Sequence, residues 1–315
     1  MSDDKIRIVA VAGPTASGKT ALSVRLAKYY SGEIISADSM QIYKGMSIAT
    51  AKPTKDEMQG IPHHLIDFLD PRESFSVSQY VKLAHEKAAE ITARGNLPII
   101  CGGTGLYMRS FLENISFSEE ETDESLRAAL MEQYRTRGGQ AMIEYIRTFD
   151  PETAQKLLPS NSKRIIRAIE IYKLTGKTMS RQILESRSEP SPYDIAAIGI
   201  TYADRQKLYD RINKRVDIMM KNGLLEEAES FYKSEIGDTA SAAIGYKELK
   251  PYLDGEVSLE QAVDKLKQET RHYAKRQLTW FKRDKYIKWI EADKCSDVYN
   301  EAVKIIDECF CKVSD

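Results

Sequence analysis

The sequence predicts an α/β protein in which a mainly parallel β-sheet is flanked by helices and interrupted by an all-helical insertion domain. Three observations support this fold class. Apolar runs typical of buried strands alternate with segments of helical spacing, as in parallel sheets covered on both faces. A glycine-rich motif joins the first such run to the first helix. From Ser125 to about Arg187 every periodic segment is helical, and strand character resumes only at 194–202.

This change of pattern predicts two domains. We expect residues 1–117 and 192–315 to form the core and residues 118–191 to form the insertion, because an insertion is the simplest account of an interrupted α/β pattern. An acidic segment, 119–124, marks the first boundary, and a loop with two prolines marks the second.

The individual elements follow from the spacing of apolar residues. Runs rich in β-branched residues predict strands at 6–12, 33–37, 97–101, 194–202 and 286–290, with a shorter candidate at 65–69. Apolar residues three and four apart predict helices at 21–27, 76–94, 105–112, 204–222, 224–233, 259–282 and 297–310. The segment 39–54 has mixed polarity and contains Gly45 and Pro53, so we expect a functional loop there.

The composition is that of an ordinary globular protein. The 315 residues are 42 % hydrophobic and carry a formal net charge of −1, so nucleic-acid binding would depend on local basic patches. No apolar run is long enough to span a membrane, and the amino-terminus has no signal-peptide pattern. The four cysteines form no C-x-x-C pair, which is typical of a reduced compartment. We therefore expect a cytoplasmic protein that does not contact a membrane.

The motif that organises the chain is Gly13-Pro14-Thr15-Ala16-Ser17-Gly18-Lys19-Thr20, which lies between a predicted strand and a predicted helix. This context is typical of a phosphate-binding P-loop, in which backbone N–H groups and a helix N-terminus point at phosphate oxygens. Lys19 supplies a full positive charge, and the Thr20 hydroxyl is the expected Mg²⁺ ligand. A glycine-rich turn without a ligand is the alternative. The motif favours a P-loop NTPase-like core that binds a diphosphate or polyphosphate.

Asp38 follows the second predicted strand, at the edge where α/β sheets place their ligands. It is a candidate general base that faces the phosphate pocket, and the alternative is an aspartate that caps a helix or a turn. The strand at 97–101 ends in two glycines instead of a carboxylate. The Walker B acid that orders water in hydrolytic ATPases is therefore missing, which favours group transfer to an organic acceptor.

Two segments concentrate basic residues. Seven basic residues oppose two acids in 160–187, and seven oppose one acid in 271–288, where Trp280 and Phe281 interleave with them. A solvated charged surface would explain either segment alone. Together, in a chain of net charge −1, they favour a phosphodiester backbone as the partner.

Arg211 and Arg215 lie four residues apart on one face of a predicted helix. They could pair with Asp210 or Asp217 on the surface, or they could clamp a leaving phosphate with their planar donors. The pair at 63–64 has no partner at metal-ligand spacing, so we interpret these histidines as loop residues.

In their order and combination, these motifs resemble the bacterial tRNA dimethylallyltransferases, which prenylate the adenosine next to the anticodon. The matching segments span nearly the whole chain: 13–20, 36–46, 49–53, 62–64, 102–107, 160–167, 211–219, 245–246 and 275–282. The resemblance implies transfer of a dimethylallyl group from dimethylallyl diphosphate to the N6 amine of that adenosine, with release of diphosphate and with Mg²⁺ as cofactor. Eukaryotic members of the family carry a carboxyl-terminal zinc finger, and the cysteine spacing here predicts the bacterial form without zinc.

The resemblance also implies residue roles. Asp38 would be the general base, and Thr15, Lys19 and Arg215 would assist at the leaving diphosphate. The P-loop, together with Arg211, would hold that diphosphate. The implied contacts to the tRNA anticodon stem-loop are Asp38, Ser39, Met40, Gln41, Thr104, Arg127, Ser160, Asn161, Ser162, Lys163, Arg164, Lys275, Arg276, Gln277 and Trp280. We expect a monomer whose insertion closes over the anticodon loop.

Two other functions are compatible with parts of the sequence. A P-loop kinase for a small molecule or nucleoside would share the P-loop, lack the Walker B acid and use Asp38 as a base, but it leaves the two basic segments unexplained. A nucleic-acid-binding NTPase would explain the basic segments but not the missing acid.

Overall fold

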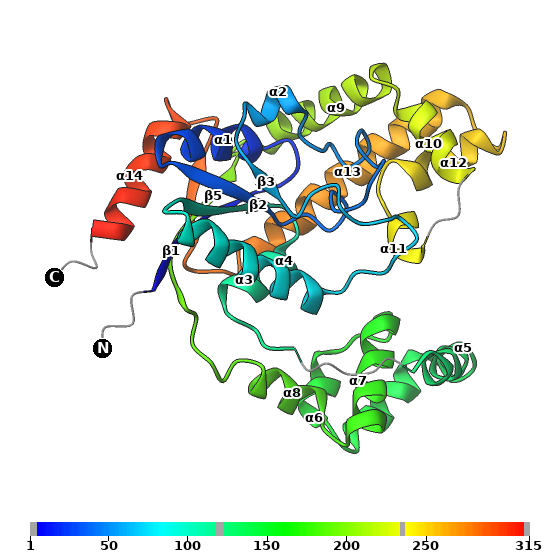
Figure 1. The fold of residues 1–315 in the computed structure, drawn as a ribbon. Helices are drawn as coiled ribbons and strands as arrows, with labels where there is room; N and C mark the ends of the chain where they lie inside the picture. Colours follow the sequence, from blue (N-terminus) through cyan, green and yellow to red (C-terminus); the bar gives the residue numbers. More distant parts are fainter. Residues whose placement is uncertain (1–4, 118–122, 234–236, 312–315) are drawn as a thin grey trace. The chain divides into compact units, whose positions relative to one another are not determined.

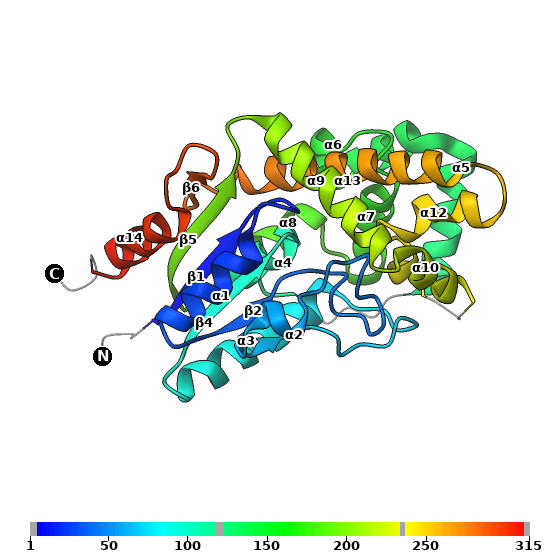
Figure 2. The same cartoon turned by 90° about the horizontal axis from the view of Figure 1, so that it is seen from above.

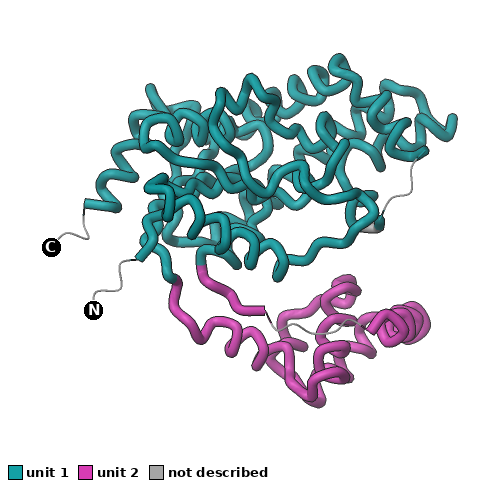
Figure 3. Tube along the Cα trace, viewed as in Figure 1, with its two compact units in different colours: residues 1–112, 192–315 teal, residues 113–191 magenta. Residues whose placement is uncertain are grey.

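In the computed structural model of the protein, residues 5–117, 123–233 and 237–311 are described. The chain divides into two compact units (Figure 3). Unit 1 comprises Met1–Leu112 and Pro192–Asp315, and unit 2 comprises Glu113–Ser191. Residues 118–122, which include the expected start of the insertion and most of the acidic segment, lie outside the described residues.

The described part of unit 1 is built on one parallel sheet of six strands in the order β3-β2-β4-β1-β5-β6. Figure 2 shows the strands from β2 to β6 from above. The predicted α/β core with a parallel sheet is therefore confirmed. Residues 8–12 of the central strand β1 are all apolar and buried, as expected for a strand that is covered on both faces. The strands are β1 (Ile6–Ala12), β2 (Gly32–Ser36), β3 (His63–His64), β4 (Leu97–Gly102), β5 (Tyr193–Thr201) and β6 (Lys288–Glu291).

Helices cover both faces of this sheet (Figure 1). α1 (Lys19–Tyr29) and α14 (Val298–Cys311) pack on one face, where they share a core with β1 and its neighbours. α3 (Val77–Ala93) and α4 (Gly105–Leu112) pack on the other face. Ser76 caps the N-terminus of α3: its side chain accepts a hydrogen bond from Gln79 N–H, and the Gln79 side chain accepts one from Ser76 N–H, which together form a capping box.

A second group of helices packs around the loop that follows β2. The loop contributes Ile42, Tyr43 and Met46 to a core that also contains Leu224 and Tyr246 from the carboxyl-terminal helices. The predicted functional loop is therefore fixed by packing. The helices that contribute to this core are α9 (Arg205–Lys221), α10 (Leu224–Tyr232), α11 (Asp238–Ser241), α12 (Tyr246–Leu253) and α13 (Leu259–Phe281). The short helix α2 (Lys55–Met58) follows the loop and contacts α1.

The described residues of unit 2 form helices with a core of their own. Leu130, Ile146, Ile165 and Ile169 are buried in it. The helical character predicted for 125–187 is confirmed, and Gly138, with φ 78° and ψ 159°, kinks the first helix. The helices are α5 (Glu124–Arg147), α6 (Pro151–Lys156), α7 (Ser162–Thr175) and α8 (Met179–Glu185).

The strand predicted at 65–69 is wrong. The strand in this region is β3, which ends at His64, because Leu65 and Asp67 both have a φ of 56° and cannot continue an extended chain. In unit 1, α2, α11 and α12 were not predicted individually, and α12 contains Pro251 inside the helix. Within the described residues, no helix combines the length and the hydrophobicity that crossing a membrane requires.

Candidate active site

A cavity of about 290 Å³ in unit 1 is lined by residues that follow three neighbouring strands of the sheet. Lys19 follows β1, Asp38 follows β2, and Gly102 ends β4. Because parallel strands all end at the same edge of a sheet, these residues come together there, as their positions in the sequence predict. α9 and α13 complete the cavity with Arg215 and Arg276.

The P-loop has the geometry of a phosphate cradle. Its turn is closed by a hydrogen bond from Ser17 N–H to the Pro14 carbonyl at 3.2 Å, and Gly18 has a φ of 96°, a conformation that favours glycine. Thr15, Lys19 and Thr20 line the cavity. Desolvation lowers the pKa of Lys19 below its ordinary value, because burial disfavours the charged ammonium. An anion bound in this cavity would stabilise that charge.

The position of Asp38 is compatible with both roles that the sequence allows. Its Oδ1 atom accepts hydrogen bonds from the backbone N–H groups of Met40 at 2.9 Å and Gln41 at 3.3 Å, which is the turn-capping role. Its Oδ2 atom has no hydrogen-bond partner among the described residues, and the side chain lines the cavity. One oxygen therefore fixes the carboxylate, and the other is available to a substrate.

Arg215 lines the cavity, and Arg211 binds the P-loop. Arg211 Nε donates to the carbonyl of Ala16 in the P-loop at 2.9 Å, and Arg215 Nη2 donates to the carbonyl of Ala51 at 3.4 Å. Desolvation lowers the pKa of Arg215, although a guanidinium remains charged at physiological pH. The two guanidinium groups are therefore anchored by backbone carbonyls beside the phosphate cradle.

Surface pairing of these arginines, the alternative from the sequence, is wrong for the described residues. Asp210 accepts a hydrogen bond from Gln206 at 2.7 Å, and Asp217 pairs with Lys267 at 2.7 Å. Both acids therefore have other partners.

The charge of the cavity wall favours an anionic ligand. The lining residues include four cationic side chains, those of Lys19, Arg215, Lys247 and Arg276, and one carboxylate, that of Asp38. Opposite charges attract over these short distances, so a diphosphate would be strongly preferred to a neutral molecule of the same size.

The residues of α13 that the resemblance assigns to tRNA do not share one environment. Lys275 and Arg276 are exposed, whereas Gln277 is 5 % exposed. Gln277 Oε1 accepts a hydrogen bond from Thr15 N–H at 2.8 Å, and its Nε2 donates to the Gly103 carbonyl at 3.1 Å. Gln277 therefore joins the P-loop to the segment that follows β4.

Trp280 packs inside unit 1. Its indole ring lies against Gly105 at the start of α4, and the Arg109 guanidinium lies 5.3 Å from the ring centroid. The indole N–H is buried and has no partner among the described residues. The structure thus gives Trp280 a packing role between α13 and α4.

The loop after β2 carries the other proposed tRNA contacts of unit 1. Met40 and Gln41 line the cavity together with Ser39. Thr104 Oγ1 accepts a hydrogen bond from Ser39 N–H at 3.0 Å, so Thr104 fixes the start of this loop.

In unit 2, Arg127 belongs to a charged cluster with a buried centre. Its guanidinium donates to Glu170 Oε2 at 3.0 Å, and Arg167 donates to the same oxygen at 2.9 Å. Glu170 is fully buried, and two arginines around one carboxylate leave a net positive charge. Residues 160–164 precede or begin α7, and Lys163 and Arg164 are exposed there.

Several lining residues were not found by sequence reasoning. Tyr273 lines the cavity and lies four residues before Gln277 on the same helix. Because residues four apart share one face of a helix, this spacing could have predicted that Tyr273 lies near the site. Burial raises the pKa of Tyr273, so its hydroxyl remains protonated. Lys247 directly follows a family-like segment at 245–246, which could also have indicated it.

His63 was interpreted as a loop residue, but it lies in β3 and lines the cavity. Its Nδ1 donates to the Ile61 carbonyl at 2.9 Å, and burial lowers its pKa, so the imidazole is neutral. No three His, Cys, Asp or Glu side chains among the described residues lie close enough together to hold a metal ion.

Comparisons with known proteins agree on one family. The family model described as IPP transferase matches residues 41–284. A tRNA dimethylallyltransferase from Thermoanaerobacter sp. (strain X514) is 49 % identical over 304 residues, which are 96 % of each chain. The tRNA dimethylallyltransferase of Bacillus subtilis (strain 168) is 49 % identical over 292 residues, which are 92 % of each chain.

Solved structures agree with these sequence relatives. The full-length tRNA isopentenylpyrophosphate transferase from Bacillus halodurans superposes with a TM-score of 0.71 at 44 % identity, covering 99 % of this chain and 100 % of that one. A eukaryotic dimethylallyltransferase acting on tRNA has a TM-score of 0.81 at 28 % identity, covering 98 % of this chain and 80 % of that one.

Proposed function

The chain belongs to the IPP transferase family, and we propose that it transfers a dimethylallyl group from dimethylallyl diphosphate to the N6 amine of the adenosine adjacent to the tRNA anticodon. Prenylation of tRNA is the activity of this family. The observation that carries this proposal is a single cavity that joins P-loop residues and the anchored Arg215 to one carboxylate, with Arg211 bound to the P-loop carbonyl of Ala16 beside it.

The P-loop side of the cavity suits the diphosphate of the donor. The P-loop N–H groups, Lys19, Arg211 and Arg215 would bind its oxygens, and the Thr15 hydroxyl would lie near the bridging oxygen. Negative charge grows on the diphosphate as the carbon–oxygen bond breaks. Fixed cations and N–H groups therefore stabilise the transition state more than the ground state.

We propose Mg²⁺ as the cofactor. Mg²⁺ is often held by one or two protein oxygens together with phosphate oxygens and waters, so the Thr20 hydroxyl and the donor diphosphate form a suitable ligand set. When bound, the ion would neutralise charge on the leaving group.

Asp38 would take the proton from the adenine amine. The lone pair of this amine is delocalised into the ring, so the amine is a poor nucleophile and needs both a base and a close approach. Oδ2 of Asp38 suits this role because Oδ1 is held by two backbone N–H groups. The new nitrogen–carbon bond replaces the carbon–oxygen bond to diphosphate.

The acceptor base would have to leave the stack of the anticodon loop to reach this cavity, as in other enzymes that modify bases. We propose that Ser39, Met40 and the exposed Lys275 and Arg276 contact the tRNA, with Gln41, Thr104 and Trp280 holding the surface on which it rests. Unit 2 would bind the anticodon stem-loop through Arg127 and residues 160–164. We propose that the active form is a monomer.

The test is mass spectrometry of nucleosides from unmodified tRNA incubated with the protein, Mg²⁺ and dimethylallyl diphosphate. A parallel reaction contains ATP in place of the prenyl donor. An adenosine heavier by one dimethylallyl group in the first reaction only would support the proposal. No modified nucleoside in the first reaction, with ADP and a phosphorylated acceptor in the second, would establish the kinase alternative instead.

A further inference from the structure

We propose that Glu227 is a positioning residue for the transfer reaction, acting through the loop 47–51 on Arg215. This inference rests on the proposed function, because it concerns groups around the donor diphosphate. Glu227 lies on α10, outside the residues that line the cavity, and no sequence motif indicated it.

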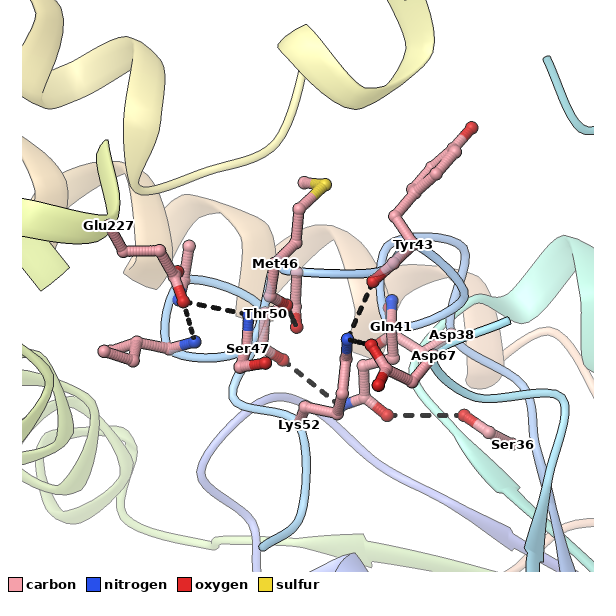
Figure 4. Close-up of polar contacts among 12 residues, drawn as sticks. Ser36, Asp38, Gln41, Tyr43, Met46, Ser47, Thr50, Lys52, Asp67 and Glu227 are labelled. Atoms are coloured by element: carbon pink, nitrogen blue, oxygen red, sulfur yellow. Dashed lines mark hydrogen bonds and ion pairs between the residues drawn. The ribbon is translucent and has the colours of Figure 1, made fainter. Parts of the chain in front are cut away.

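The Glu227 carboxylate caps the start of this loop (Figure 4). Oε2 accepts hydrogen bonds from Ser47 N–H at 3.0 Å and Ile48 N–H at 2.8 Å, and Oε1 accepts one from Ala49 N–H at 2.8 Å. The Tyr246 hydroxyl donates to Oε1 at 2.9 Å and so fixes the carboxylate itself. A carboxylate that satisfies three consecutive N–H groups determines the path of the backbone there.

The same loop ends in the wall of the cavity. Ala49, Thr50 and Ala51 are lining residues. The Ala51 carbonyl accepts hydrogen bonds from Arg215 Nη2 at 3.4 Å and from Gln41 Nε2 at 3.2 Å. A shift of this carbonyl would therefore move a guanidinium that we place at the leaving group.

Hydrogen bonds within the loop, from Ala51 N–H to the Ile48 carbonyl and from Lys52 N–H to the Ser47 carbonyl, both at 2.9 Å, close its turn, and contacts at its two ends fix it to the rest of unit 1. Ala51 has a φ of 48°, a left-handed conformation that is strained for alanine and persists only where the surroundings impose it. The far end is held by Lys52, whose Nζ contacts the Tyr43 carbonyl at 2.7 Å and Asp67 at 2.5 Å (Figure 4). The near end is held by Glu227, so loss of its carboxylate would let the strained segment relax.

The test compares Glu227→Gln with a matched control, Glu226→Gln, which changes the same charge at the adjacent exposed position of α10. A glutamine has one acceptor oxygen, and its NH₂ group would face backbone N–H donors. We expect kcat/KM for dimethylallyl diphosphate to fall about tenfold in Glu227→Gln, and to change by less than about twofold in the control. The tRNA dissociation constant should stay near the wild-type value, whereas the melting temperature should fall in Glu227→Gln because backbone N–H groups lose a carboxylate acceptor.

A double-mutant cycle with Arg215→Lys separates positioning from a merely structural role. If Glu227 acts through Arg215, its substitution should cost less than about threefold in the Arg215→Lys background. An equal loss in both backgrounds, or a loss matched by weaker tRNA binding, would overturn the proposal. Wild-type kinetics in Glu227→Gln would also overturn it.

A second variant keeps the test decisive if Glu227→Gln does not fold. Tyr246→Phe retains the buried ring and removes one donor to the carboxylate, so kcat/KM for the donor should fall about threefold. An unchanged value would then overturn the proposal. The wild-type reaction serves as the separate check, because an inactive wild-type protein would refute the proposed function, whereas an active one leaves only the role of Glu227 in question.

Discussion

The side-chain oxygen of Gln277 accepts a hydrogen bond from the backbone N–H of Thr15 at 2.8 Å, which ties α13 to the P-loop across 262 positions of the chain. We expect Gln277→Ala to leave this N–H and the Gly103 carbonyl without partners, lowering the free energy of unfolding by roughly 1–3 kcal/mol. The KM for dimethylallyl diphosphate should rise because the cradle is less well fixed. Urea unfolding and steady-state kinetics measure both. A stable variant with normal donor kinetics but weak tRNA binding would assign Gln277 to recognition instead.

Lys275, two residues away on the same helix, is exposed and should behave oppositely. We expect Lys275→Ala to leave stability unchanged and to weaken tRNA binding. The slope of log Kd against log salt concentration should fall by about one, because one fewer phosphate contact releases one fewer counterion. Titrations at several salt concentrations measure the slope. The control is Lys294→Ala, since Lys294 already pairs with Glu291 at 3.0 Å. An equal effect in both variants would mean that Lys275 acts only through the net charge.

Asp38 permits a variant that separates its two oxygens. Asparagine can keep the Oδ1 bonds to Met40 and Gln41 while losing the basic oxygen. We therefore expect Asp38→Asn to lower the single-turnover rate by roughly 10²–10⁴-fold, with tRNA affinity and melting temperature close to wild type. A rate within a few fold of wild type would rule out general-base catalysis by Asp38.

Glu33 should make stability depend on pH. Hydrogen bonds from Arg94, and with smaller effect from Asn96 and His64, lower the pKa of Glu33 to about 2. In the unfolded chain the Glu33 carboxylate takes up its proton at a higher pH than in the folded protein. The stabilisation that ionised Glu33 gives the folded state is therefore complete above the unfolded pKa, and it is lost as the pH falls toward 2. We expect Glu33→Gln to lower the free energy of unfolding at pH 7 by roughly 2–3 kcal/mol and to flatten its decline below pH 5. Urea unfolding at several pH values measures this. A variant that declines as steeply as wild type would show that other carboxylates dominate.

Local patterns predicted the parts of the site that depend on short stretches of chain. The P-loop was recognisable because strand, glycine loop and helix follow one another directly, and Asp38 was placed correctly because parallel strands end at one edge. The strand predicted at 65–69 was wrong because nothing in the residue types of Leu65 and Asp67 signals a positive φ.

The remaining parts of the site depend on packing between distant segments. The resemblance assigned Gln277 to the tRNA together with its exposed neighbours, although tertiary packing turns it inward. The contacts between Glu227 and the backbone at 47–49 join segments 178 to 180 residues apart, so no local pattern could indicate them.

The position of β1 has a consequence for synthesis on the ribosome. This strand pairs with β4 on one side and, along all seven of its residues, with β5 on the other, and β5 is translated only after the whole of unit 2. A nascent chain that stops before Tyr193 therefore presents an unpaired edge at the centre of its sheet. Unit 2 has its own core and leaves the ribosome before β5 does. Its helices can therefore fold before β1 has paired with β5.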